Sequence, residues 1–193
     1  MQSDPPNGGN GHGKPMTPEE NDLLCRVEGD APMGQLMRRH WVPICLSEEV
    51  SEPDGTPVKA RILGEDLVVF RDTEGRVGVM DERCPHRRAS LVYGRNEDGG
   101  LRCLYHGWKM DTAGNCTEQP FEPANSPLKK DVCATEYQVE KLAGIYWGYM
   151  GPKPAPLLPR YEVLVGTSGK RFVQVLPEIE ANWLQVMENS VDT

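Results

Sequence analysis

Two short cysteine–histidine pairs are the residues of this chain best suited to chemistry. One residue separates Cys84 from His86, two residues separate Cys103 from His106, and sixteen residues lie between the pairs. Two thiolates and two imidazoles are the ligand set of a [2Fe–2S] cluster that has cysteine on one iron and histidine on the other. The spacing therefore predicts that two loops, each giving one cysteine and one histidine, hold such a cluster.

The predicted ligands divide between the two irons. Cys84 and Cys103 would hold the inner iron, because thiolates are soft and strong donors, and His86 and His106 would hold the outer iron. Replacing two thiolates by neutral imidazoles raises the reduction potential above that of all-cysteine plant-type ferredoxins. The second ring nitrogen of each histidine would face solvent or a partner, which lets reduction couple to proton uptake.

A zinc site is the alternative that the same four residues leave open. Zinc sites usually pair two ligands of a kind, as in C-x2–4-C and H-x3–5-H, and the mixed pairs found here fit that pattern poorly. A zinc-binding interaction module is therefore the less favoured interpretation. A visible absorption spectrum separates the two, since zinc is colourless and the iron–sulfur cluster is red-brown.

Composition and charge exclude several classes of function. The 193 residues carry a net charge of −8 with no basic run to neutralise phosphates, so nucleic acid is not an expected partner. No segment approaches the apolar length that spans a bilayer, and residues 1–15 lack the apolar core of a secretory signal. We therefore predict a cytoplasmic protein with no membrane partner. The remaining cysteines are expected to be plain thiols: Cys25, Cys45, Cys116 and Cys133.

The local pattern predicts the elements that position the two loops. Thr17-Pro18-Glu19-Glu20 predicts a capped helix start, with the helix running to about Val27, and a second helix is expected from Pro32 to about Arg39. A period of two in apolar residues then predicts strands: 58–62, 67–71, 77–80, 135–139 and 144–149. The expected fold is mainly β, a small antiparallel β-sandwich preceded by helices.

Changes in composition predict four parts of the chain. They are a disordered lead (1–16), the helices with the cluster domain (17–150), a stiff Pro-rich linker (151–159) and the truncated start of an α+β domain (160–193). In the last part we expect a strand at 171–175 and a helix at 178–189. This part ends on an amphipathic element with no partner, which is typical of a domain that is only begun.

The two cluster segments resemble the Rieske domain of bacterial aromatic ring-hydroxylating oxygenases. The resemblance covers roughly residues 40 to 150 and rests on C-P-H-R-R-A-S-L from Cys84 and C-L-Y-H-G-W-K-M-D from Cys103. Rieske proteins of respiratory complexes carry an extra cysteine in each loop, and these form a disulfide. Here Arg88 and Tyr105 stand in the loops instead. The resemblance therefore implies a potential near the low end of the Rieske range, roughly −150 mV.

The last residues resemble the opening of the catalytic domain in the same oxygenase α subunits. Asn182-Trp183, Glu188-Asn189 and Asp192 match an N-W…E-N…D stretch. The resemblance implies that Asp192 bridges a cluster histidine of a neighbouring subunit to an iron-bound histidine and carries electrons between them. The two histidines and the carboxylate that hold mononuclear Fe(II) in the family would follow Thr193. A mononuclear iron is therefore expected in the full-length protein only.

The resemblance also implies a function and its partners. The chain is similar to the N-terminal part of α subunits in the phthalate or phenoxybenzoate dioxygenase group, which includes O-demethylases. That implies an NAD(P)H-dependent flavin and iron–sulfur reductase as electron donor, an aromatic substrate and a homotrimer. A stand-alone Rieske ferredoxin is the alternative. The helical lead and the tail beyond the linker count against it, because a simple carrier needs neither.

Overall fold

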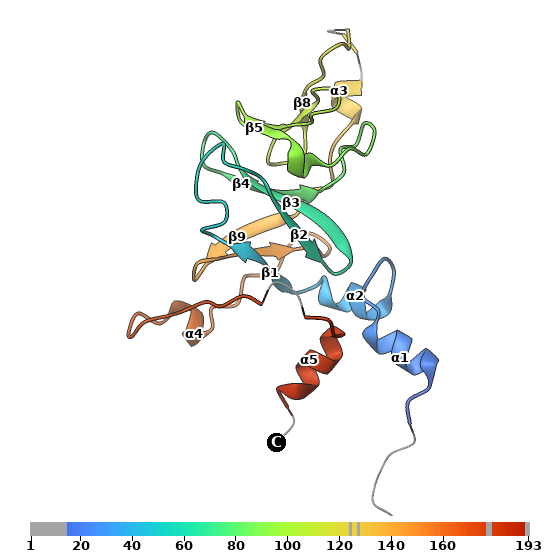
Figure 1. Cartoon of the computed structure of the whole chain (residues 1–193), viewed down its shortest axis with the longest axis vertical. Coiled ribbons are helices and arrows are strands. Elements are labelled where there is room, and N and C mark those ends of the chain that lie inside the picture. Colours follow the sequence, from blue (N-terminus) through green and yellow to red (C-terminus); the bar gives the residue numbers. More distant parts are fainter. Residues whose placement is uncertain (1–14, 124, 127, 177–178, 192–193) are drawn as a thin grey trace, which may run out of the picture.

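Three small antiparallel sheets form the framework of the described part of the molecule (Figure 1). The computed structural model describes residues 15–123, 125–126, 128–176 and 179–191. The first sheet has the order β1 (Trp41–Leu46), β10 (Ile145–Tyr149), β9 (Gln138–Leu142), and the second β2 (Val58–Ile62), β3 (Glu65–Arg71), β4 (Val77–Asp81). The third runs β5 (Arg95–Glu97), β6 (Gly100–Arg102), β7 (Lys109–Met110), β8 (Cys116–Glu118). The predicted mainly β fold is confirmed.

The β2-β3-β4 sheet lies between the other two and is buried on both faces. Alternate residues of a strand point to opposite faces, so β3 supplies two cores at once. Val68 and Phe70 pack into a core with Leu101, on the side of the β5–β8 sheet. Leu67 and Val69 pack on the other side, in the core shared with β1 and β10. Burial on both faces explains why β3 is a continuous apolar run rather than an alternating one.

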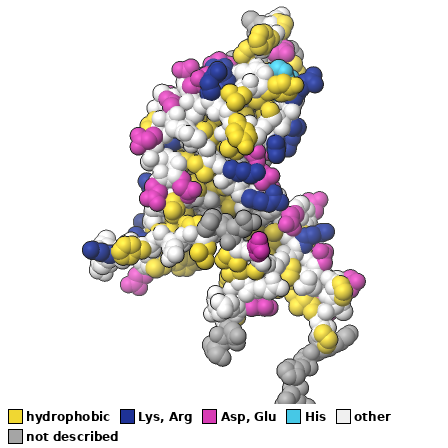
Figure 2. All heavy atoms as spheres, in the orientation of Figure 1, with side chains coloured by type: hydrophobic (Ala, Val, Ile, Leu, Met, Phe, Trp, Pro, Cys, Tyr) yellow, Lys and Arg dark blue, Asp and Glu magenta, His cyan; other side chains and the backbone are white. Residues whose placement is uncertain are grey.

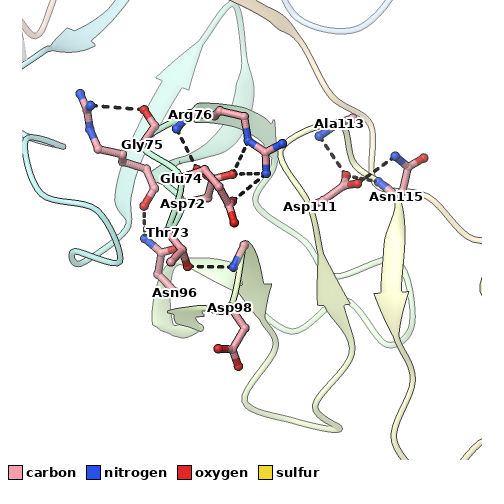
Figure 3. A network of polar contacts seen from close by, with 12 residues as sticks. Asp72, Thr73, Glu74, Gly75, Arg76, Asn96, Asp98, Asp111, Ala113 and Asn115 are labelled. Carbon is pink, nitrogen blue, oxygen red and sulfur yellow. Dashed lines mark hydrogen bonds and ion pairs between the residues drawn. The ribbon is translucent and has the colours of Figure 1, made fainter.

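A polar network joins the turn between β3 and β4 to the β5–β8 sheet (Figure 3). The fully buried Asp72 carboxylate accepts from the Arg76 backbone N–H at 2.8 Å and from its Nε at 2.7 Å. Asn96, on β5, donates its side-chain amide to the Arg71 carbonyl at 2.7 Å. Thr73 Oγ1 accepts from the backbone N–H of Gly99 at 2.9 Å. These contacts fix the β5–β6 hairpin, and with it the loop that follows β6, on the central sheet.

Short helices flank the sheets. Those before the first strand are α1 (Pro18–Cys25) and α2 (Pro32–Met37), and the later ones are the 3-10 helix η1 (Leu91–Tyr93), α3 (Leu128–Asp131), α4 (Glu162–Val165) and α5 (Trp183–Asn189). The predicted capping box of α1 is present, with Thr17 and Glu20 exchanging hydrogen bonds of 2.8 and 3.2 Å. Within the described residues, no helix is both long and apolar enough to cross a bilayer.

Arg38 ties the helical lead to the sheets. Its side chain is 8% exposed and pairs with Glu65 of β3 at 2.7 Å. The same guanidinium donates to the carbonyl of Val27, between α1 and α2, at 3.1 Å and to the carbonyl of Leu63 at 3.0 Å. A buried guanidinium needs such partners, because an unpaired buried charge is costly. The segment that carries α1 and α2 is therefore fixed to the sheets.

Two sequence predictions beyond the central sheet need correction. The strand expected at 135–139 is β9, at Gln138–Leu142, because its register is set by the turn to β10 at Ala143 and Gly144, which both have positive φ. The strand expected at 171–175 is absent. That segment is exposed and no described strand pairs with it, while the Arg171 side chain donates to the carbonyls of Val163 and Gly166 at 2.8 and 3.1 Å.

The other expectations for the ends of the chain fall partly outside the described residues. Of the predicted lead, residues 1–14 are not described, nor are residues 177–178 at the predicted start of the last helix. The helix itself is α5, Trp183–Asn189, which begins later than predicted because Asn182 caps it and residues 179–182 are not helical. Its first turn lies against α1, because Asn182 Nδ2 and Trp183 Nε1 both donate to the carbonyl of Cys25, at 3.3 and 3.1 Å.

Candidate iron–sulfur site

Two loops at one end of the molecule carry the predicted ligands and share one backbone pattern. In the first loop (84–89), the Cys84 N–H donates to the carbonyl of Ala89 at 2.9 Å, and the Arg88 N–H donates back to the carbonyl of Cys84 at 2.9 Å. Arg88 has φ of +58°, a left-handed conformation that costs a residue with a Cβ about 1–2 kcal/mol. The loop is therefore closed on itself, with the cysteine at its base.

The second loop (103–108) repeats these contacts. The Cys103 N–H donates to the carbonyl of Trp108 at 2.8 Å, and the Gly107 N–H donates to the carbonyl of Cys103 at 3.0 Å. Gly107 takes the left-handed place of Arg88, with φ of +72°, and a Cβ there would meet Pro120 Cγ at 3.0 Å. Glycine thus meets both demands of this position, the positive φ and the close neighbour.

The two cysteine sulfurs lie together in the core between the central sheet and the β5–β8 sheet. Cys84 is 1% exposed and Cys103 is 3% exposed. The Cys84 thiol donates to the Cys103 sulfur, which is the main cause lowering the pKa of Cys103 to about 6 and raising that of Cys84. Backbone N–H groups also point at both sulfurs, those of His86 and Arg87 at Cys84 and those of Tyr105 and His106 at Cys103.

The two histidines form a second pair. The ring centroids of His86 and His106 are 4.7 Å apart, at 64° to one another. Trp108 stacks on His86, with centroids 4.3 Å apart and planes within 5°, and so holds that ring in place. His106 Nδ1 is buried and finds no hydrogen-bond partner among the residues that the structure describes. A buried nitrogen lone pair without a donor is suited to a metal ion.

The arrangement fits the predicted cluster. Sulfur is paired with sulfur and imidazole with imidazole, which is the division of ligands that a cluster with one cysteine-bound and one histidine-bound iron needs. The N–H groups around the sulfurs are the donors that tune such clusters. In the described ranges, no three His, Cys, Asp or Glu side chains gather around one point. Two pairs of side chains could therefore hold the [2Fe–2S] cluster: Cys84 with Cys103, and His86 with His106.

An ion-pair network with two buried cations and two partly exposed carboxylates supports the second loop. Arg102 donates from Nε to Glu97 at 2.5 Å, from Nη2 to Glu118 at 2.8 Å and from Nη1 to the carbonyl of Gly107 at 3.0 Å. Lys109, 5% exposed, pairs with Glu118 and donates to the carbonyl of Asp98. Bonds from Lys109 and Arg102 lower the pKa of Glu118, and bonds from Arg102 lower that of Glu97. Both carboxylates are therefore held charged.

The other predicted residues lie apart from the ligand pairs or outside the described part. Cys25 and Cys45 are half-buried, Cys133 is exposed, and Cys116 is buried in the same core as the ligand cysteines. Asp192 lies outside the described residues, so its predicted bridging role stays a prediction. Sequence reasoning missed Arg102. The sequence shows that Arg102 directly precedes the predicted ligand Cys103, but its hydrogen bond to the carbonyl of Gly107 forms only in the folded chain.

His86 and His106 are half-buried. At the end of the molecule that carries β5 and β8, a histidine side chain is visible at the surface, with apolar, basic and acidic side chains around it (Figure 2). Leu104 and Tyr105, in the second loop, are 59% and 62% exposed, and the Tyr105 ring lies 3.9 Å from that of His106. The cysteines are thus shielded within the protein, while the histidine side of the site lies near the surface.

Comparison with known proteins identifies the class. Residues 40–138 match the Rieske [2Fe-2S] domain, so the chain belongs to the Rieske family, and this membership implies a [2Fe–2S] cluster. Its subgroup is that of aromatic ring-hydroxylating oxygenase α subunits of the phthalate dioxygenase-like kind.

Three similar proteins support the narrower placement. The phthalate 4,5-dioxygenase oxygenase subunit of Pseudomonas putida is 60% identical over 181 residues, which are 92% of this chain and 40% of that protein. The 5,5'-dehydrodivanillate O-demethylase oxygenase subunit of a Sphingobium strain is 46% identical, over 92% of this chain and 42% of its own length. The phenoxybenzoate dioxygenase subunit alpha of Ectopseudomonas oleovorans is 39% identical, over 88% of this chain and 44% of that one. This chain thus spans about two fifths of the length of these relatives.

Solved structures give the same result for the fold. A crystal structure of dicamba monooxygenase bound to dicamba superposes with a TM-score of 0.58 at 26% identity. The superposition covers 65% of this chain and 39% of the monooxygenase chain.

Proposed function

We propose that Cys84 and Cys103 hold one iron of a [2Fe–2S] cluster and that His86 and His106 hold the other. The carrying observation is the sorting of the four side chains into a buried sulfur pair and a neighbouring imidazole pair, with His106 Nδ1 left without a described partner. When bound, the cluster supplies one-electron transfer. The residues of the chain hold it, shield its sulfurs from water and present the imidazoles near the surface.

We further propose that this part serves the oxygenase activity of a longer protein. The relatives are oxygenase subunits, and this chain covers only two fifths of them. An NAD(P)H-dependent flavin and iron–sulfur reductase would supply electrons. A mononuclear Fe(II) site in the full-length protein would receive them and act on an aromatic substrate, in a cytoplasmic homotrimer. A stand-alone Rieske ferredoxin remains the second candidate, and sequencing past Thr193 distinguishes them: an in-frame histidine pair supports the oxygenase and a stop codon the carrier.

The reduction potential tests the oxygenase type of site. Histidine ligation without a loop disulfide places the expected midpoint at roughly −150 mV, the low end of the Rieske range. Arg88 and Tyr105 occupy the loops where the respiratory type has its extra cysteines, and no disulfide joins any of the six cysteines, all of which lie in the described residues. Spectroelectrochemical titration of the reconstituted chain measures the midpoint. A value above zero would contradict the assignment.

For Asp192 we propose the bridge between a cluster histidine and an iron-bound histidine of the next subunit. The support is its place in the sequence, three residues after Asn189, the last residue of α5, within the N-W…E-N…D stretch. In the full-length protein, Asp192→Asn should leave the cluster spectrum unchanged while product formation collapses, because the electron path is cut and the cluster is not. Glu180→Gln, at an exposed carboxylate before α5 and outside that stretch, is the matched control. Unchanged turnover in the Asp192 variant would remove this residue from the path.

A further inference from the structure

Arg102 directly precedes Cys103, and its side chain extends to the backbone of Gly107, the residue that follows His106. The Arg102 side chain is 12% exposed, and its Nη1 donates to the carbonyl of Gly107 at 3.0 Å. Gly107 directly follows His106, and its N–H donates to the carbonyl of Cys103. The second loop is therefore held at its closing residue by a backbone bond on one side and a guanidinium on the other.

The peptide held by Arg102 controls atoms close to the proposed ligands. Gly107 stands at φ of +72°, a conformation open to rotation because no Cβ restricts it. Rotation there would displace the His106 ring and the N–H groups of Tyr105 and His106 that point at the Cys103 sulfur. A carbonyl bonded to a buried guanidinium cannot turn without leaving a buried donor unpaired.

The first loop is held differently. Its left-handed residue, Arg88, bonds outward through its own side chain, from Nη1 to Asp81 at 3.1 Å. That pair is exposed, at 64% for the Arg88 side chain and 32% for Asp81. Exposed pairs contribute little because solvent screens them. Only the second loop, which carries Cys103 and His106, is therefore held by a buried guanidinium, that of Arg102.

The charge of Arg102 is paired within its own network. Its guanidinium bonds both carboxylates, Glu97 and Glu118, and these are shared with the exposed Arg95 and with Lys109. The effect of Arg102 on a nearby cluster is therefore mainly geometric. A lysine would keep the charge but has a single point donor in place of the planar fork, so Arg→Lys separates geometry from charge.

We propose that Arg102 is a positioning residue that fixes the second loop and thereby sets the reduction potential of the cluster. The proposal rests on the proposed function, since it needs Cys103 and His106 as ligands. N–H donors to sulfur stabilise the more negative reduced cluster. Loosening the loop weakens these bonds, so the potential should fall when Arg102 loses its hold on Gly107.

The experiment compares Arg102→Lys with Arg95→Lys in the reconstituted chain. Arg95 donates to the same Glu97, from Nε at 3.2 Å, but its side chain is 61% exposed. Arg102→Lys should lower the midpoint potential, alter the EPR signal of the reduced cluster and speed iron release to a chelator about tenfold, as expected for a supporting partner of a metal ligand. Arg95→Lys should match the wild type in all three measurements.

A second variant keeps the test decisive if Arg102→Lys fails to fold. Glu118→Asp keeps the negative charge but shortens the side chain that holds Nη2 of Arg102, and a smaller shift in the same direction is expected. Wild-type potential, EPR signal and iron release in every folded variant at Arg102 or Glu118 would overturn the inference. Failure of the proposed function looks different, because the wild-type chain itself would then bind no [2Fe–2S] cluster.

Discussion

Cys103→Ser is expected to leave the chain without its cluster. Cys103 is 3% exposed and its sulfur accepts from the Cys84 thiol and from two backbone N–H groups, so the site is built for a thiolate. A serine hydroxyl does not ionise there and offers iron a harder, weaker ligand. The loss should exceed the ~10–100-fold drop in affinity that follows removal of an outer partner of a metal ligand. Iron and acid-labile sulfide analysis after anaerobic reconstitution measures it.

Cys133→Ser is the matched control for this experiment. Cys133 is an exposed thiol on the chain between α3 and β9, outside both loops. Its replacement should leave iron, sulfide and the visible spectrum at wild-type levels. Equal cluster content in the Cys103 and Cys133 variants would refute the ligand assignment.

His106→Cys should keep a cluster but lower its potential strongly. A third thiolate replaces one of the two neutral imidazoles, and the added negative charge stabilises the oxidised state. With His86 still a ligand, the midpoint should move from roughly −150 mV part of the way toward the roughly −400 mV of all-cysteine plant-type clusters, a fall of up to about 250 mV. The pH dependence of the potential that comes from this imidazole should also disappear. Titration at several pH values measures both effects.

His40→Cys provides the comparison. His40 lies before β1, in a pocket lined by Trp41 and Trp147, and is not near the cluster loops in sequence. Its replacement should leave the midpoint potential and its pH dependence unchanged. If His106→Cys retained the wild-type potential, His106 would not be a ligand.

The central strands could be predicted from the sequence because their own residues determine them. The run 58–62 is β2 without change, and the capped start at Thr17 is present. In both places local signals agree with the packing: alternation beside a two-residue turn, and a side chain bonded to its own backbone. The four ligand positions were equally visible, since residue type and spacing carry that signal.

The cluster sheet and the support of the site could not be predicted in this way. The strands β5 to β8 are two or three residues long, too short for a hydrophobic period. Arg88 takes a left-handed conformation that its residue type disfavours, and only the closed loop explains it. The hold of Arg102 on Gly107 joins a strand end to a loop end, and only folding brings these together. Conversely, the run 171–175, with its Phe and two Val residues, predicted a strand, but no described strand lies beside it to form hydrogen bonds with it.

The Mössbauer spectrum of the chain reconstituted with isotope-enriched iron and sulfide is the most direct test. If cysteines bind one iron and histidines the other, the spectrum should show two unlike iron sites in equal amounts, and one electron should reduce only one of them. Two equivalent irons, a single iron per chain, or a colourless protein that retains only zinc would contradict the account.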